Sequence, residues 1–174
     1  DLDSVLDYIK VNNLSIAGAL LTHGHYDHAL GLSMFDGHAY INLDDEFLAR
    51  NPDEQIKSFI GQDVDIEEYN GELKSIDTLN SDYIIVHKNP GHTKGSVSYE
   101  FPNEGLIFTG DFVFKDSIGR TDLFSGSMDQ MNTSLRETFL NFEEEFEILP
   151  GHGPSGKVRS IKNNNEYIKV LLND

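Results

Sequence analysis

Three histidines and one aspartate fall within six consecutive positions near the start of the chain: His23, His25, Asp27 and His28. Neutral imidazole and carboxylate groups are the ligands that zinc and similar divalent ions take in proteins. Four such groups side by side would be unfavourable in a hydrophobic core, because buried polar groups need hydrogen-bond or metal partners. The cluster therefore predicts a metal site on one short turn.

Three later segments each place a single metal-capable residue directly after a glycine. These residues are His92, Asp111 and His152. Glycine permits a tight turn and a close approach of the backbone. A lone loop histidine is more often ordinary than a ligand, but the first cluster and these motifs together hold five of the seven histidines. His38 and His87 lie outside them, and we interpret both as structural.

The composition is that of one folded domain. The chain has 174 residues, of which 38% are hydrophobic and 25% charged, so a single domain over residues 1–174 can bury one substantial core. The sequence contains no cysteine, which excludes disulfides and thiolate metal ligands. It starts with aspartate rather than methionine, and we expect a domain that is processed or incomplete at its N-terminus.

The net charge restricts the partners. With 13 Lys and Arg against 30 Asp and Glu, the formal charge is −17, and such a surface repels the phosphate backbone of nucleic acids. No apolar stretch approaches the roughly 18–20 residues that a membrane span needs, and no secretory signal opens the chain. We therefore expect a cytoplasmic protein whose partner is a small molecule, not a nucleic acid or a membrane.

Apolar periodicity and turn residues predict helices and strands that are interspersed along the chain. Expected helices cover residues 2–12, 29–35, 46–50, 131–142 and 161–172, and expected strands cover 16–21, 38–43, 83–87, 96–101, 106–109 and 146–149. This mixture is typical of a layered α/β fold. It places the histidine cluster and the three glycine motifs on loops that follow strands.

Two polar tracts give only local predictions. Asp44 and Asp45 precede the helix expected over residues 46–50, and we interpret them as its N-cap. The tract Asn163-Asn164-Asn165 lies within the last expected helix, and we assign it no role. The polar segment 55–79 gives no clear prediction.

The order of the metal-capable motifs resembles the metallo-β-lactamase superfamily of metal-dependent hydrolases, over about residues 14–154. The family pattern is T-H-x-H-x-D-H, then a histidine, an aspartate after a strand and a last histidine, and it matches this chain from Thr22 onward. The resemblance implies an αββα sandwich. Family members usually begin with a pair of strands, so we expect this fold to lack its first N-terminal strands.

The resemblance also implies a binuclear metal centre. Its first ion would be held by His23, His25 and His92, its second by Asp27, His28 and His152, and Asp111 would bridge both. Two divalent ions are the expected cofactors, zinc first, with iron or manganese as alternatives. Two such ions about 3.5–4 Å apart can act together on a carbonyl or phosphoryl group.

The run Gly119-Arg120-Thr121-Asp122 is similar to the single-domain branch related to hydroxyacylglutathione hydrolase. The ending Leu149-Pro150-Gly151-His152-Gly153-Pro154 favours the same branch. The resemblance implies hydrolysis of a thioester or similar acyl compound, with S-lactoylglutathione-like substrates as the leading candidates. A hydroxide that bridges the two ions would attack the carbonyl, whose oxygen one ion polarises.

Three residues could serve this reaction besides binding metal. Asp27 and Asp111 are the candidate catalytic carboxylates, although both are also expected ligands. Arg120 could bind a substrate carboxylate, because a guanidinium suits a planar anion. It could equally pair with Asp122 or Asp116 in a structural loop, and both interpretations stay open.

Two alternative functions also stay open. The run G-R-T-D occurs in iron-dependent persulfide dioxygenases on the same fold, which would need one ion with open positions for oxygen. An inactive, metal-binding fragment is the other alternative, because the expected N-terminal strands are missing. A β-lactamase is the least favoured function. Residues 155–174 are too few for the C-terminal domain of two-domain glutathione thioester hydrolases, which argues against strict glutathione specificity.

Overall fold

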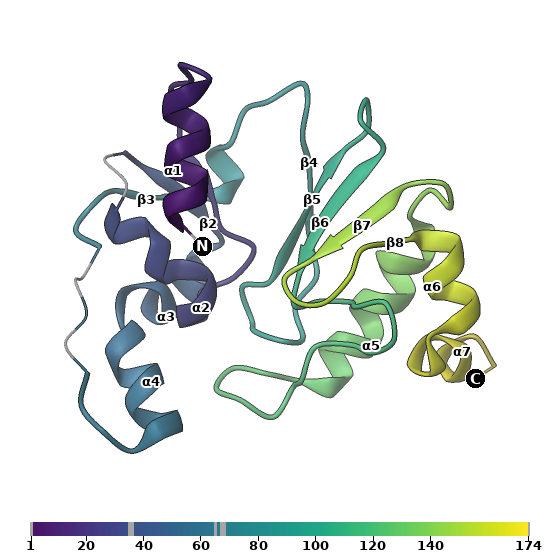
Figure 1. Ribbon diagram of the computed structural model, residues 1–174. Helices are drawn as coiled ribbons and strands as arrows, with labels where there is room; N and C mark the ends of the chain where they lie inside the picture. The colour runs from purple at the N-terminus through teal and green to yellow at the C-terminus, as the bar shows by residue number, and fades with distance from the viewer. Residues whose placement is uncertain (1, 35–36, 65, 67–68, 174) are drawn as a thin grey trace.

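The computed structural model describes residues 2–34, 37–64, 66 and 69–173. Its strands form two sheets that pack against each other, with helices on both outer sides (Figure 1). The first sheet has the order β1 (Ala19–Leu20), β2 (Ala39–Ile41) and β3 (Leu73–Ser75). Neighbouring strands in this sheet are parallel, so each connection crosses from one end of the sheet to the other.

The second sheet brings three strand ends to one edge. Its order is β4 (Ile85–Lys88), β5 (Val97–Phe101), β6 (Leu106–Gly110), β7 (Glu147–Pro150) and β8 (Gly156–Lys157). β6 and β7 are parallel, whereas the other neighbouring pairs are antiparallel. β4, β6 and β7 therefore run in the same direction, and the loops after them start at the same edge.

Helices cover the outer faces of the two sheets (Figure 1). Those beside the first sheet are α1 (Leu2–Val11), α2 (Tyr26–Ala29), α3 (Glu46–Arg50) and α4 (Pro52–Ile60), and those beside the second are α5 (Met128–Glu137), α6 (Val158–Asn164) and α7 (Glu166–Asn173). Short 3-10 helices cover Leu30–Met34, Leu43–Asp45, Ile76–Thr78 and Phe139–Asn141. No helix in the described part of the chain is long and apolar enough to cross a membrane.

Three apolar clusters fill the spaces between these layers. Phe139 and Ile148 lie in the cluster between the second sheet and α5–α7. Val97 belongs to a cluster between the two sheets, against which Tyr40 of the first sheet packs. Ile41 lies in the cluster between the first sheet and the helices beside it. The layers thus follow the order α–β–β–α, and the predicted αββα sandwich is confirmed.

The structure corrects several of the expected boundaries. β1 covers only Ala19–Leu20 of the strand expected over 16–21, because its partner β2 is itself only three residues long. The helix expected over 131–142 starts earlier, where Ser127 caps α5 by accepting a hydrogen bond from the backbone of Gln130. The helix expected over 29–35 is the end of α2 and a 3-10 helix through Met34, and residue 35 lies outside the described residues.

The last expected helix is divided at Asn165, and assigning no role to that residue was wrong. Asn165 is fully buried. Its Nδ2 donates to the carbonyl oxygens of Phe114 (3.2 Å) and Ser117 (2.9 Å), and its Oδ1 accepts from the backbone of Tyr167 (3.0 Å). The side chain therefore caps α7 and holds the loop that follows β6.

Replacing Asn165 with alanine should lower the free energy of unfolding by about 1–3 kcal/mol, because two carbonyls lose their donor and α7 loses its cap. Urea denaturation followed by circular dichroism measures this change. Asn164→Ala is the matched control, since the exposed Asn164 side chain bonds to Ser160 one turn earlier. Equal losses in the two variants would contradict the role of Asn165.

Candidate metal centre

The loop and helix after β1 carry the first four metal-capable residues. His23 and His25 lie on the loop, and His25 is the N-cap residue of α2. Asp27 and His28 lie within α2. The end of β1 is fixed to the second sheet, because the backbone N–H of Val97 donates to the carbonyl of Thr22 (2.8 Å). This hydrogen bond holds the loop after β1 of the first sheet at the edge of the second sheet.

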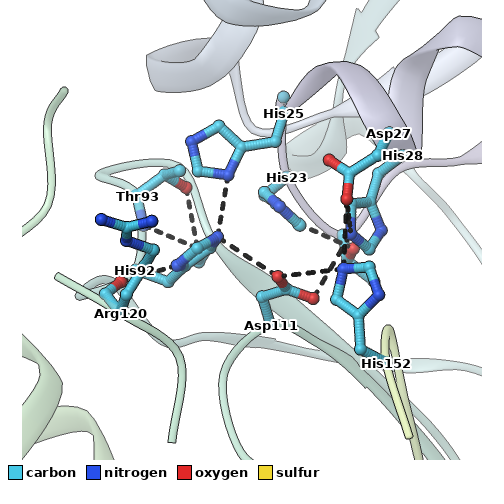
Figure 2. A network of polar contacts seen from close by, with 12 residues as sticks. His23, His25, Asp27, His28, His92, Thr93, Asp111, Arg120 and His152 are labelled. Carbon is cyan, nitrogen blue, oxygen red and sulfur yellow. Dashed lines mark hydrogen bonds and ion pairs between the residues drawn. The ribbon is translucent and has the colours of Figure 1, made fainter. Parts of the chain in front are cut away.

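The remaining three residues come from that edge of the second sheet. His92 lies in the turn after β4, Asp111 follows β6 and His152 follows β7. These strands run in the same direction, so their carboxyl ends deliver the three side chains to one place. Figure 2 shows the seven side chains pointing toward one another from both sheets.

The seven residues form two adjoining groups, and a third set, His23, His28 and Asp111, joins them. The ligand-type atoms of His23, His25 and His92 lie within 4.8 Å of one another, and so do those of Asp27, His28 and His152. Asp111 stands between the groups: its Oδ2 lies 3.5 Å from Nε2 of both His92 and His152. Its Oδ1 lies 3.3 Å from Nε2 of His28. One carboxylate thus faces both groups.

Several buried atoms of the cluster have no hydrogen-bond partner among the described residues. They are Nε2 of His23, together with Nε2 of His28 and Oδ1 of Asp111, which face each other at 3.3 Å as an ion pair without hydrogen-bond geometry. Each unsatisfied group of this kind costs about 1–3 kcal/mol. A cation bound between these atoms would remove that cost, and a set of nitrogen and oxygen donors suits zinc, iron or manganese. The residues therefore fit a divalent metal centre.

Hydrogen bonds at the far side of two rings fix which nitrogens face the cluster. His92 Nδ1 lies 2.7 Å from the carbonyl oxygen of Arg120 and donates to it, which leaves the lone pair on Nε2. His25 Nδ1 lies 2.8 Å from that Nε2. Thr22 Oγ1 lies 3.2 Å from Nδ1 of His23, and Nε2 of His23 is again the inward atom.

Burial sets the protonation of the inner histidines. Burial, with the neighbouring imidazoles, holds the pKa of His23 well below its ordinary value. Burial and then His92 lower the pKa of His25 to about 4. Both rings are therefore neutral at pH 7 and able to act as ligands. Burial acts against the charged form of Asp111, but neighbouring histidines, His28 foremost, keep the pKa of Asp111 below its usual value.

A cavity of about 590 Å³ opens onto the cluster. His25, Asp27, His92, Asp111 and His152 contribute to its lining. Apolar side chains, among them Phe114 and Leu123, line another part of its wall. A small molecule in this cavity would meet both groups of metal-capable residues at once.

Arg120 lies on the same lining, and its guanidinium is bound to a carboxylate. Nε and Nη2 of Arg120 donate to the two carboxylate oxygens of Asp122, at 2.7 and 2.8 Å. This pairing lowers the pKa of Asp122 to about 2. Of the two interpretations of Arg120, the loop pairing is therefore present, and its partner is Asp122 rather than Asp116. Arg120 is also one of the residues that line the cavity.

Sequence reasoning missed two residues near the cluster. Lys115 lines the cavity and forms no ion pair among the described residues; its position four residues after Asp111 was the available signal. Asp45 was interpreted as a helix cap, and it does occupy the N-cap position of α3, but its side chain makes no capping hydrogen bond. Its carboxylate instead accepts from the backbone N–H groups of Gly24 and Gly95. Those partners lie 21 and 50 residues away, so no local pattern could reveal them.

Comparison with known proteins identifies the family. A family model described as the metallo-beta-lactamase superfamily matches residues 2–152, which include all seven residues of the cluster. The chain belongs to the metallo-β-lactamase superfamily. Superfamily members of this kind are metal-dependent hydrolases, and the fold binds divalent metals, consistent with the histidine cluster.

Relatives with assigned names support the same class for this superfamily member. A probable metallo-hydrolase of Streptococcus pyogenes is 31% identical over 175 residues, covering 94% of this chain and 75% of that protein. The hydroxyacylglutathione hydrolase GloC of Haemophilus influenzae is 28% identical over 179 residues, covering 97% of this chain and 83% of that protein.

Solved structures share the metallo-β-lactamase fold of this chain. The BLEG-1 B3 metallo-beta-lactamase superposes with a TM-score of 0.83 at 27% identity, covering 97% of this chain and 84% of that one. TTHA1623, crystallised in a di-iron-bound form, gives a TM-score of 0.83 at 23% identity, with 96% and 85% covered. The identity of the metal therefore has to be argued for this chain separately.

Gly151 offers a test of how tightly the cluster is packed. A Cβ added there would collide with Oδ1 of Asp111 and lie 2.5 Å from Cε1 of His28. Gly151→Ala should therefore displace both side chains and weaken zinc binding by at least about tenfold, measured by competition with a chelator. Gly31→Ala is the control, since an added Cβ meets nothing within 4 Å there. Unchanged zinc affinity in Gly151→Ala would refute this packing.

Proposed function

We propose that this metallo-hydrolase cleaves a thioester or a related acyl compound, with S-lactoylglutathione-like substrates as the leading candidates. The observation that carries the proposal is the position of Asp111. Its Oδ2 lies 3.5 Å from a histidine of each group, His92 and His152, on the lining of the cavity. This arrangement suits a pair of cations acting on one substrate group.

The proposed ligands follow the two groups. His23, His25 and His92 would hold one ion and Asp27, His28 and His152 would hold the other, with Asp111 lying between the two groups. We propose zinc as the native metal, because the donor set is rich in imidazole and contains no thiolate. When bound, the ions would polarise the substrate carbonyl and lower the pKa of an attacking water.

The two carboxylates of the centre, Asp27 and Asp111, have different proposed roles. The Asp27 side chain is 37% exposed, whereas that of Asp111 is 12% exposed. Asp27 is therefore the carboxylate placed to accept a proton from an attacking water in the cavity. Asp111 is held among the imidazoles and keeps the two groups together. A thiol is a good leaving group, since its pKa is about 8–9, so no strong acid is needed on the leaving side.

The cavity also suits an anionic acyl compound. Arg120 uses two of its five N–H groups on Asp122 and retains the others for substrate. Lys115 supplies a second cation on the lining. Two relatives bear the name hydroxyacylglutathione hydrolase, at 28% and 33% identity, and that name supports a thioester substrate for this chain as well.

Metal content and activity together test the proposal. The purified protein should contain close to two zinc ions per chain, and it should hydrolyse members of a thioester panel. About one iron per chain with persulfide-dependent oxygen uptake would instead indicate a persulfide dioxygenase. Bound metal without turnover of any thioester would indicate an inactive metal-binding protein.

Substitutions of two cluster residues make the test specific to this site. His92→Ala and Asp111→Asn should each reduce bound zinc and lower kcat/KM for thioester hydrolysis by at least about 100-fold. His38→Ala is the control, because His38 packs on Tyr40 outside the cluster. Activity at the wild-type level in either cluster variant would refute the ligand assignment.

Arg120→Ala tests the proposed substrate contact. It should raise KM about 2- to 5-fold for thioesters that carry a carboxylate, as expected for one exposed ion pair, and leave kcat and zinc content unchanged. Steady-state kinetics with charged and neutral thioesters measure the difference. Arg159→Ala is the control, since Arg159 pairs with Glu144 away from the cavity. Equal KM changes for both kinds of substrate would leave Arg120 with a loop role alone.

A further inference from the structure

The Asp45 carboxylate is buried between the two turns that supply the first group of histidines. Asp45 is 0% exposed, and it lies at the end of the 3-10 helix after β2 in the first sheet. No Lys or Arg forms an ion pair with it among the described residues. A buried carboxylate without a cation is costly unless hydrogen bonds compensate it.

Three donors from two different turns compensate this carboxylate. Oδ2 of Asp45 accepts from the backbone N–H of Gly24 (2.9 Å) and from the hydroxyl of Thr93 (2.6 Å). Its Oδ1 accepts from the backbone N–H of Gly95 (2.8 Å). Since Thr93 gives its proton to Asp45, the hydroxyl of Ser96, 2.7 Å away, donates to the oxygen of Thr93. Each of these three hydrogen bonds therefore requires an acceptor atom on the Asp45 side chain.

These donors are neighbours of the proposed metal ligands. Gly24 lies between His23 and His25, and Thr93 follows His92 directly. The two turns come from different sheets, β1 supplying one and the β4–β5 connection the other. One carboxylate thus bonds to both turns that supply the first group of histidines.

The space around Asp45 leaves little room for movement. A Cβ added at Gly95 would lie 2.5 Å from Cγ of Asp45, so the turn after His92 packs directly on the carboxylate. A displacement of Asp45 would therefore be passed to the backbone beside both histidine turns.

We infer that Asp45 is a positioning residue, which holds the turns of His23–His25 and His92 at the separation that a shared cation requires. This inference rests on the metal centre proposed above. The hydrogen bonds of the Asp45 carboxylate go to two backbone N–H groups and one hydroxyl, so Asp45 would act through these groups and not as a ligand. Partners of metal ligands typically change metal affinity about 10- to 100-fold when they are replaced.

Asp45→Asn tests the inference with little change in size. The amide replaces one acceptor oxygen with a donor, so either Gly95 or the Gly24 and Thr93 pair would face an N–H group. Zinc affinity, measured by chelator competition well below the unfolding temperature, should fall about 10- to 100-fold. The visible spectrum of the cobalt-substituted protein should also change, because the ligand geometry changes.

Asp44→Asn is the matched control. Asp44 is the adjacent residue, is exposed and pairs with Lys94 at 2.8 Å. Its substitution should leave zinc affinity and the cobalt spectrum at their wild-type values. A residue that merely stabilised the fold would lower the unfolding temperature in Asp45→Asn without moving either metal readout, and that result would overturn the inference.

A second pair of variants covers the case in which Asp45→Asn does not fold. Thr93→Val removes the hydroxyl donor, whereas Thr93→Ser keeps it. Zinc affinity should fall in the valine variant and be retained in the serine variant, and equal affinities would overturn the inference. Wild-type protein that binds no zinc would overturn the metal centre as well. Zinc binding without thioester hydrolysis would overturn only the proposed substrate.

Discussion

Crowding of imidazole rings is the constraint on which the rest of this structure depends. The ring of His23 has three other histidine rings around it, with centroids 4.2–4.9 Å away. Burial keeps the rings of His23 and His25 neutral, yet the inward nitrogen of His23 finds no hydrogen-bond partner in the described part of the chain. Such a group of atoms is unfavourable unless something electrophilic lies between them. A divalent cation satisfies this condition, and it also explains why an acidic residue, Asp111, lies among the rings.

The backbone of both sheets holds these rings together. Strands β4, β6 and β7 end at one edge, so their loops converge without long connections. The loop after β1 joins them through the Val97–Thr22 backbone bond and through the Tyr99 hydroxyl, which donates to the carbonyl of Leu21 (2.7 Å). Asp45 adds a buried polar tie at the same junction. The centre is therefore assembled by contacts between the layers, and its geometry depends on how the two sheets pack.

The sequence predicted the layered fold and the residues that gather at the centre, because both depend on local patterns. Glycine beside His92 or His152 marks a turn, and apolar runs mark the strands before them. Contacts between distant segments were not predictable in this way. The sequence around Asp45 predicts a helix cap. The fold, however, places its carboxylate beside Thr93, 48 residues along the chain. Asn165 likewise reads as helix interior, because its carbonyl partners lie 48 and 51 residues earlier. The sequence overestimated the lengths of strands in the first sheet, because the length of a strand depends on the strand with which it pairs.

The anionic substrate proposed above requires a source of positive potential at the cavity. The chain carries a net charge of −17, which repels anions from most of its surface. Asp122 already pairs with Arg120, and the lining carries the opposite charges of Lys115 and Asp116 side by side. The attraction would therefore come mainly from the cations of the proposed centre, since a bound ion carries the largest charge in such a site. Metal binding would then serve two purposes at once: it would satisfy the buried histidines, and it would reverse the local field in favour of the proposed acyl anion.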